Sequence, residues 1–360
     1  MVEHRFDRTV DSCSYECSTV GMRWTTQAVD ADDGALPGLE RSGLVRRVQT
    51  PEFDGITFHE VLCKSALNKT PEASRLPFDY TVNTFRGCSH ACRYCFARPT
   101  HEYLDLDAGH DFDTQLVVKT NVAAVLRREL ARKSWKREHV ALGTNTDPYQ
   151  RAEGRYRLMP GVIGALAESG TPFSILTKGT LLRRDLPLIA LASRQVDVRV
   201  SVSLAIGDHE LQQQIEPGTP SPKARLDLIR AIADAGMSCH VMVAPVIPFL
   251  TDSKQHLEGL FADLAAAGAS GVTVIPMHLR GSTRGWFLSW MSAEHPALLP
   301  RYRRLYGRGA YVSPEYTRWL DARVDPLVER YGLAGRQPAH RGAETPASPK
   351  SEPVGPPTLF

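Results

Sequence analysis

The sequence predicts an α/β fold, a partial (β/α)6 barrel with a C-terminal helical extension. Two observations carry this prediction. Six short apolar, β-branched runs recur along the middle of the chain, and helical stretches fall between them. Alternating strands and helices are typical of parallel strands joined by right-handed crossovers. A doubly wound open sheet is the alternative, because strand order is not visible in a sequence.

The six expected strands are the apolar runs themselves. They are Tyr80–Phe85, His139–Leu142, Pro172–Leu176, Val196–Leu204, Cys239–Val246 and Gly271–Ile275. Polar residues directly follow most of these runs, as in the segment from Gly143 to Asp147. Because the carboxyl ends of parallel strands meet at one rim, we expect these polar residues to share a functional site.

Five helices are expected between and after the strands. The first begins at Asn121, a plausible N-cap before apolar residues at helical spacing, and the second runs from Met159 to Gly170. The third is expected to be capped by Asp185, with Pro187 in its first turn. The last two run from Ser221 to Gly236 and from Asp252 or Ser253 to Gly268.

Composition excludes several classes of protein. The 360 residues include 43 Lys and Arg against 40 Asp and Glu, a net charge of +3 that gives no whole-chain polycation for nucleic acid. Apolar residues make up 42%, enough for a buried core. No apolar run approaches the roughly 18 residues of a membrane span, and no secretory signal follows the charged start. We therefore expect a cytoplasmic protein.

The chain divides into four expected segments. Residues 1–50 form a weakly ordered N-terminal segment, residues 51–280 the partial barrel, and residues 281–334 a helical extension. Residues 335–360 contain six prolines among Ser, Ala, Gly and charges, a composition typical of a disordered tail.

Three cysteines carry the strongest chemical signal. Cys88, Cys92 and Cys95 have C-x3-C-x2-C spacing on the loop after the first expected strand. Clustered thiolates favour zinc or an iron–sulfur cluster. A closed zinc site would need a fourth ligand, for which His90, His101 and Cys63 are the candidates. A cubane held by three cysteines leaves one iron open to bind another molecule.

This motif resembles the signature of the radical S-adenosylmethionine (SAM) superfamily, including the aromatic Tyr94 just before the last cysteine. The resemblance implies a [4Fe–4S] cluster bound by Cys88, Cys92 and Cys95, whose open iron chelates SAM. It implies an enzyme that cleaves SAM to a 5′-deoxyadenosyl radical, and a reductant such as flavodoxin or ferredoxin. SAM cleavage requires no catalytic acid or base, so none is assigned. Cys239 and Tyr149 are candidate hydrogen-atom donors.

The resemblance also places the SAM contacts. Thr144, Asn145 and Asp147 follow the second expected strand, where the superfamily has a loop contacting the methionine amino group. Lys178 can face the carboxylate as a compact cation. Ser203 suits a contact to a hydroxyl or to the carboxylate.

Three further positions complete the expected cofactor site. Ala244 ends the fifth strand where adenine could lie flat, and Tyr94 adds a backbone contact to that ring. Arg225 is either a carboxylate clamp or an exposed helix residue.

Three segments look like the spore photoproduct lyase-like branch of the superfamily: residues 143–150, 177–179 and 216–222. That branch includes a lyase that acts on a thymine-dimer photoproduct in DNA, so nucleic acid is a possible substrate here. Each segment also has a plain structural interpretation, such as a helix-entry loop with Ser221 as N-cap.

Basic and aromatic residues leave a second class of function open. Arginines at 301, 303, 304 and 308 alternate with Tyr302, Tyr306 and Tyr311. They either stack bases and hold phosphates or form a helix with its tyrosines inward. With the cysteine triplet, they support the alternative of a non-enzymatic zinc-binding, nucleic-acid-binding module.

Overall fold

The computed structural model describes residues 43–71 and 76–335. Within these residues the main sheet has seven strands in the order β11-β10-β9-β8-β7-β4-β3. Six of them are parallel: β4 (Tyr80–Val82), β7 (Val140–Leu142), β8 (Phe173–Thr177), β9 (Val198–Ser203), β10 (Cys239–Val246) and β11 (Gly271–Pro276). Their spatial order follows the chain without reversal. The sheet is therefore singly wound, which confirms the partial barrel over the doubly wound alternative.

The first expected strand divides between two sheets. Residues 80–82 form β4 of the barrel, whereas β5 (Phe85–Arg86) pairs with β6 (Gln115–Lys119) in a second sheet. The break follows from a hydrogen bond: the Lys119 amide donates to the Thr84 carbonyl over 3.1 Å and draws the chain toward β6. The cysteine loop therefore begins at the junction of the two sheets.

The second sheet has the order β1-β2-β6-β5 and contains β1 (Leu44–Val48) and β2 (Thr57–Val61). The expectation of a weakly ordered segment up to residue 50 is wrong for its last residues, because β1 pairs with β2. Val48 and Phe53 pack against the apolar cluster around Phe58. The short strand β3 (Leu67–Lys69) joins the barrel sheet antiparallel to β4. The remaining residues of both terminal segments, 1–42 and 336–360, lie outside the described residues.

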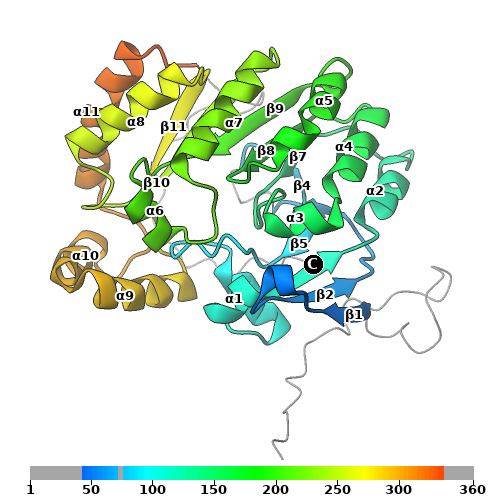
Figure 1. Cartoon of the computed structure of the whole chain (residues 1–360), viewed down its shortest axis with the longest axis horizontal. Helices are drawn as coiled ribbons and strands as arrows, with labels where there is room; N and C mark the ends of the chain where they lie inside the picture. The colour runs from blue at the N-terminus through cyan, green and yellow to red at the C-terminus, as the bar shows by residue number, and fades with distance from the viewer. Residues whose placement is uncertain (1–42, 72–75, 336–360) are drawn as a thin grey trace, which may run out of the picture.

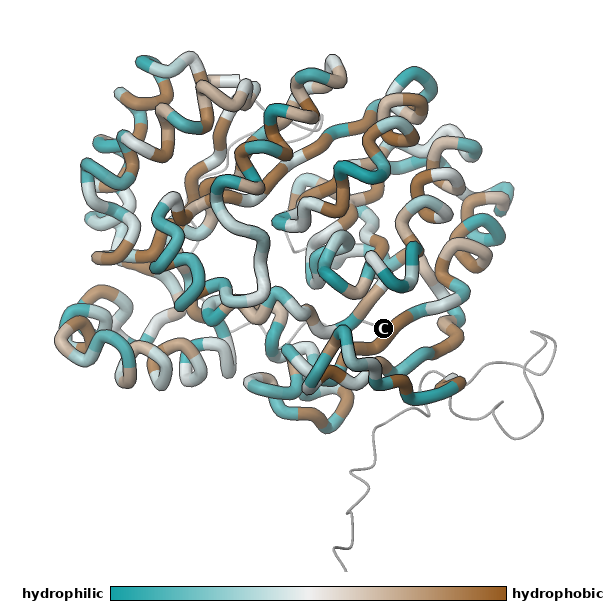
Figure 2. Tube along the Cα trace, viewed as in Figure 1, coloured by the Kyte–Doolittle hydropathy of each residue, from teal (hydrophilic) through white to brown (hydrophobic). Residues whose placement is uncertain are grey.

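Helices cover the outer face of the barrel sheet (Figure 1). They are α2 (Val122–Leu130), α4 (Met159–Glu168), α5 (Leu182–Ala192), α7 (Pro222–Asp234), α8 (Lys254–Ala266) and α11 (Pro314–Arg330). Ser221 and Ser253 cap α7 and α8 as expected. The side-chain hydroxyl of each serine accepts a hydrogen bond from a backbone N–H in the first turn of its helix. Apolar side chains of the strands and helices form one core cluster between the layers. Figure 2 shows hydrophobic residues recurring along both the strands and the helices.

The expected start of α5 is wrong. The helix begins at Leu182, so Asp185 lies in its first turn and Pro187 lies inside it. The Asp185 carboxylate does not cap the helix but binds the Arg184 guanidinium at 2.7 Å. Pro187 is the sixth residue of the helix, so its missing N–H removes the bond that another residue there would donate to the Arg183 carbonyl.

Five further helices of the described residues flank the carboxyl end of the barrel. These are α1 (His110–Thr114), α3 (Arg151–Tyr156), α6 (His209–Ile215), α9 (Ser282–Glu294) and α10 (Leu299–Tyr306). Tyr302 and Tyr306 are buried and stacked, with ring centroids 5.8 Å apart, whereas Tyr311 is 57% exposed. The interpretation as a helix with its tyrosines inward therefore holds for two of the three tyrosines, Tyr302 and Tyr306.

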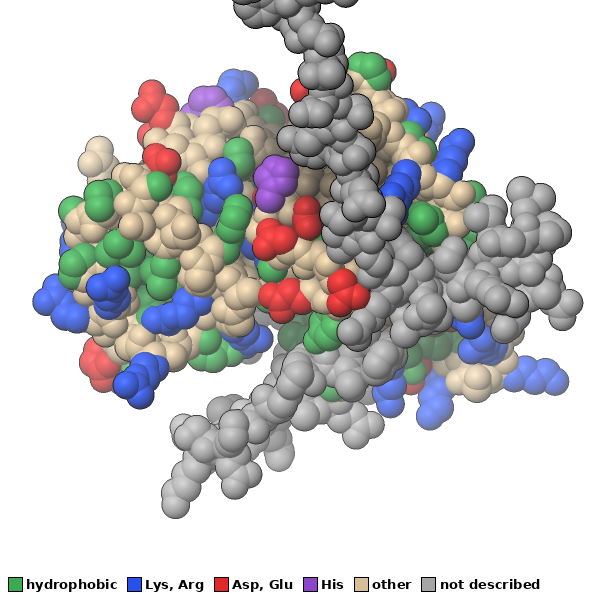
Figure 3. Space-filling view, turned by 90° about the horizontal axis from the view of Figure 1, so that it is seen from below, with side chains coloured by type: hydrophobic (Ala, Val, Ile, Leu, Met, Phe, Trp, Pro, Cys, Tyr) green, Lys and Arg blue, Asp and Glu red, His purple; other side chains and the backbone are tan. Residues whose placement is uncertain are grey.

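No helix of the described residues is long and apolar enough to cross a membrane. On the face seen in Figure 3, Lys and Arg side chains are spread over the described surface rather than gathered in one patch. This distribution agrees with the near balance of charge in the sequence.

Candidate active site

One hollow lies at the carboxyl ends of the barrel strands. Residues near the carboxyl ends of five of these strands line it: Thr144 after β7, Lys178 after β8, Ser203 of β9, Ala244 of β10 and His278 after β11. Cys88, Cys92 and Cys95 line the same hollow. The expectation that polar residues behind successive strands share one rim is confirmed.

Backbone contacts fix the start of the cysteine loop. Gly87 has φ +79°, and a side chain there would meet Leu116 at 2.7 Å, so glycine allows both the turn and the close approach. The next residue, Cys88, donates its amide to the Phe112 carbonyl over 3.0 Å. Arg98 is completely buried and donates to the Cys92 carbonyl at 3.1 and 3.0 Å.

Burial keeps two of the three thiols protonated while no metal is bound. Burial raises the pKa of Cys95 to about 11 and raises the pKa of Cys92 well above its ordinary value. Because a metal binds the thiolate, metal binding would release these protons and depend on pH. In the described part of the chain, no three His, Cys, Asp or Glu side chains are grouped for a single metal ion. The three thiols share the lining of one hollow.

A buried ion pair joins the cysteine loop to the loop after β7. His90 Nδ1 lies 3.3 Å from Asp147 Oδ2. Burial opposes the charge of His90, but Asp147 and Cys88 outweigh it and raise the pKa of His90 to about 10. Asp147 also accepts hydrogen bonds from the Thr177 hydroxyl and from the Lys178 amide, the latter at 2.6 Å. Asp147 therefore links three of the loops that form the site.

Glu216 is the centre of a second network. Its carboxylate is completely buried, pairs with Arg225 at 2.8 Å, and accepts a hydrogen bond from the Tyr94 hydroxyl. Lys178 Nζ lies 3.9 Å away and donates to Ser203 Oγ over 2.8 Å. Burial opposes the charge of Glu216, but Arg225 and then Lys178 hold its pKa below the ordinary value.

Most of the residues predicted to contact SAM line the hollow. These are Tyr94, Thr144, Asn145, Asp147, Lys178, Ser203 and Ala244. Thr144 Oγ1 is buried and has no hydrogen-bond partner among the described residues, which leaves it available to a ligand. Arg225 does not line the hollow; it lies behind it, completely buried, and donates to the Ser203 carbonyl at 3.1 Å. The alternative of an exposed Arg225 is therefore wrong.

The two candidate hydrogen-atom donors do not lie at the hollow. Tyr149 and Cys239 are both buried in the main core, and Cys239 is the first residue of β10, at the opposite end of the barrel from the rim. Cys63 belongs to the same core, and His101 is hydrogen-bonded to the Gln115 carbonyl at 2.9 Å. Cys13 and Cys17 lie outside the described residues.

Sequence reasoning missed two parts of the site. One is Glu216, for which the sequence predicts no role of its own beyond its place in the segment 216–222. The available signal was an acidic residue beside Pro217 and Gly218 on a loop. The other is an aromatic row at the mouth of the hollow, where His278 lies 6.2 Å from Phe96 and 5.9 Å from Tyr311 between ring centroids. These residues are distant in the sequence, and no local pattern joins them.

Known proteins share this fold and sequence pattern. Residues 82–260 match the family model of the Radical SAM superfamily. An uncharacterized protein of Mycobacterium tuberculosis is 68% identical over 336 residues, which cover 92% of this chain and 97% of that protein. An uncharacterized protein of Methanocaldococcus jannaschii is 27% identical over 175 residues, 48% of this chain and 62% of that protein.

Solved structures of spore photoproduct lyase share the fold. A cysteine-to-serine mutant has a TM-score of 0.58 and 17% identity over 76% of this chain and 79% of its own. A double mutant with bound AdoMet and dinucleoside spore photoproduct has a TM-score of 0.57 and 16% identity over the same shares.

The partial barrel, the cysteine loop and the family match together define the class: the chain belongs to the radical SAM superfamily. It is an enzyme of the radical SAM type, and SAM cleavage by radical chemistry is its reaction class. This membership overturns the alternative of a non-enzymatic zinc-binding module.

Proposed function

We propose that Cys88, Cys92 and Cys95 hold a [4Fe–4S] cluster and that SAM binds beside it in the same hollow. When bound and reduced, the cluster supplies the electron that cleaves SAM to a 5′-deoxyadenosyl radical. The observation that carries the proposal is that three thiols and the ends of five parallel strands line one hollow. Soft thiolate donors suit iron–sulfur chemistry, so the residues present fit the group.

The chain's own side chains position the cofactor. Lys178 Nζ, held by Ser203 and facing Glu216, supplies the positive charge for the SAM carboxylate. Thr144 offers its unpartnered hydroxyl, and Asn145 lines the hollow next to it. The Asp147 carboxylate is already paired with His90, and the Arg225 guanidinium is already paired with Glu216. We therefore assign these two residues a positioning role.

An anaerobic assay tests this proposal. The protein is reconstituted with iron and sulfide and reduced, and 5′-deoxyadenosine is then measured. Iron and sulfide content is measured in parallel for Cys88→Ala, Cys92→Ala and Cys95→Ala. Cys239→Ala is the matched control, because that thiol is buried in the core. Loss of the cluster in the three variants and its retention in the control are expected. A full cluster in any of the three removes that cysteine from the assignment.

The aromatic row favours a substrate with flat rings. Phe96 and Tyr311 are 50% and 57% exposed, and the Arg280 guanidinium lies 5.1 Å from the Tyr311 ring. Phe96 and His278 also line the hollow, so the row leads from the surface to the proposed SAM pocket. Aromatic and guanidinium planes are the surfaces on which single-stranded bases stack. We infer that the substrate carries a nucleobase.

Binding of a single-stranded oligonucleotide to the cluster-loaded protein tests this inference. Tyr311→Ala should weaken binding by roughly 1–3 kcal/mol if a base stacks on the ring. The control is Trp319→Ala, because Trp319 is 39% exposed and lies on α11, outside the row. Equal binding by the Tyr311 variant and the native chain would contradict base stacking there.

A further inference from the structure

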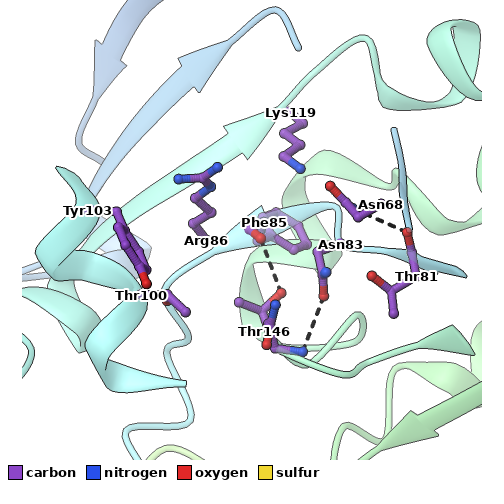
Figure 4. A pocket seen from close by; sticks show the side chains of 10 residues that line it. Asn68, Thr81, Asn83, Phe85, Arg86, Thr100, Tyr103, Lys119 and Thr146 are labelled. Atoms are coloured by element: carbon purple, nitrogen blue, oxygen red, sulfur yellow. Dashed lines mark hydrogen bonds between the residues drawn. The ribbon is translucent and has the colours of Figure 1, made fainter. Parts of the chain in front are cut away.

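A second hollow lies where the two sheets meet. Its lining comes from β3, β4, β5, β6, the 3₁₀ helix η5 (Arg98–Leu104) and the loop after β7 (Figure 4). Two cations, Arg86 of β5 and Lys119 of β6, belong to this lining. No Asp or Glu is among the residues that form it. The hollow is therefore positively charged on its inner surface.

Neither cation is compensated inside the protein. Lys119 is only 8% exposed, and no carboxylate of the described residues lies within ion-pairing distance of Lys119 or Arg86. The groups that favour the charge of Lys119 are the Cys63 thiol and then Glu129, whose oxygens already accept from the Ser65 hydroxyl and from the Ala66 and Leu67 amides. Burying a cation without a counter-ion costs free energy, so this arrangement needs a ligand to balance it.

Neutral donors complete the surroundings of the two charges. Asn83 accepts from the Asn145 amide at 3.3 Å with its side-chain oxygen, which leaves its amide N–H groups for the hollow. Thr81 and Tyr103 also belong to the lining, on opposite sides of the hollow in Figure 4. A set of two cations and several N–H and O–H donors matches a tetrahedral oxyanion, which accepts hydrogen bonds from many directions.

We propose that Arg86 and Lys119, with Asn83, form a subsite for a phosphate group of the substrate. Arginine binds phosphate with two parallel N–H donors, and lysine adds a point charge. Two cations match a phosphate monoester dianion better than a single carboxylate. The inference rests on the proposed function in one respect: the phosphate belongs to the molecule on which the radical acts.

The position of the hollow supports that link. Asn145 and Thr146 line both this hollow and the proposed SAM pocket. Thr146 Oγ1 also donates to the Phe85 carbonyl at 3.2 Å, next to Arg86. A substrate anchored by its phosphate would therefore lie directly beside the loop that borders the SAM pocket.

Calorimetric titration of inorganic phosphate into the cluster-loaded, anaerobic protein tests the subsite. Arg86→Gln and Lys119→Met should each weaken phosphate binding about tenfold or more, because each removes a hydrogen bond to a charged group. Lys64→Met is the matched control, since Lys64 is exposed and outside the hollow, and it should bind phosphate as the native chain does. Two variants are used so that a folding defect in one does not decide the result.

The outcomes separate this subsite from the proposed function. Absence of phosphate binding by the native chain, or undiminished binding by both variants, overturns the subsite even if the native chain forms 5′-deoxyadenosine. Weakened binding in both variants supports the subsite, whether or not 5′-deoxyadenosine forms. Absence of 5′-deoxyadenosine would overturn the proposed function alone. Competition by a nucleoside monophosphate points to a terminal phosphate of a small substrate. Competition by an oligonucleotide with internal phosphates alone points to a nucleic-acid strand.

Discussion

The Tyr94 hydroxyl donates a hydrogen bond to the Glu216 carboxylate, although the two residues lie 122 positions apart. Tyr94 belongs to the cysteine loop, and Glu216 follows α6. Because Glu216 also binds Arg225 and faces Lys178, one buried carboxylate ties the proposed cluster loop to the proposed SAM pocket. The cysteine loop is thus positioned by residues that the cysteine motif itself does not contain.

We predict that Glu216→Gln destabilises the protein and weakens SAM binding. The change removes the charge that balances Arg225, and breaking a buried ion pair typically costs about 3–5 kcal/mol. Thermal unfolding of the cluster-loaded protein and anaerobic titration of SAM measure the two effects. Glu210→Gln, at an exposed position of α6, is the control and should change neither. A Glu216 variant as stable as the native chain would argue against the network.

Gly218→Ala is predicted to disrupt the cysteine loop. A Cβ at this position would lie 1.9 Å from the Ser89 carbonyl oxygen, which is backbone and has little room to move. The Gly218 amide also donates to the His90 carbonyl at 3.1 Å. We expect reduced iron content and lower stability in this variant.

The matched control for this glycine is Gly259→Ala. Gly259 lies inside α8, and a Cβ there meets nothing within 4 Å. Alanine is favoured over glycine within a helix by about 1 kcal/mol, so this variant should be slightly more stable. Full iron content in Gly218→Ala would show that the two loops separate without harm.

Lys178→Ala should weaken SAM binding roughly tenfold or more and leave the cluster in place. Hydrogen bonds to charged groups contribute about 1.5–3 kcal/mol, and Glu216 keeps Arg225 as its partner in this variant. SAM titration and iron analysis measure the two properties. Lys223→Ala removes an exposed lysine of α7 and serves as control. Unchanged affinity would remove Lys178 from the cofactor site without affecting the cysteine assignment.

Local patterns predicted the barrel well, and long-range contacts account for what they missed. The six runs became parallel strands because β-branched, apolar segments suit a sheet covered by helices. The second sheet was not predicted, since β5 has only two residues and both β5 and β2 pair with β6, which lies far from them in the sequence. The cysteine spacing is local and was readable, whereas the Arg86–Lys119 hollow needs strands from both sheets.

The last prediction concerns Lys119 and pH. Burial lowers the pKa of Lys119 to about 8, and Arg86 adds to this effect, while Cys63 and Glu129 oppose it. The ordinary lysine pKa applies to the unfolded chain, so between about pH 8 and pH 10 the unfolded chain binds the proton that the folded chain has released. The free energy of unfolding should therefore rise with pH across this window.

The expected size of this rise is about 3 kcal/mol, and Lys119→Met should lack it because methionine does not titrate. Thermal unfolding of the native and variant proteins is compared across this pH range in a buffer without phosphate. The pH dependence that comes from titratable groups present in both proteins cancels in the difference between them. The variant should also be more stable at pH 7, where the native chain keeps a buried cation without a counter-ion. Parallel pH curves for the two proteins would mean that Lys119 keeps its ordinary pKa. Such curves would also mean that burial does not destabilise the charge of Lys119, and the phosphate proposal would lose that support.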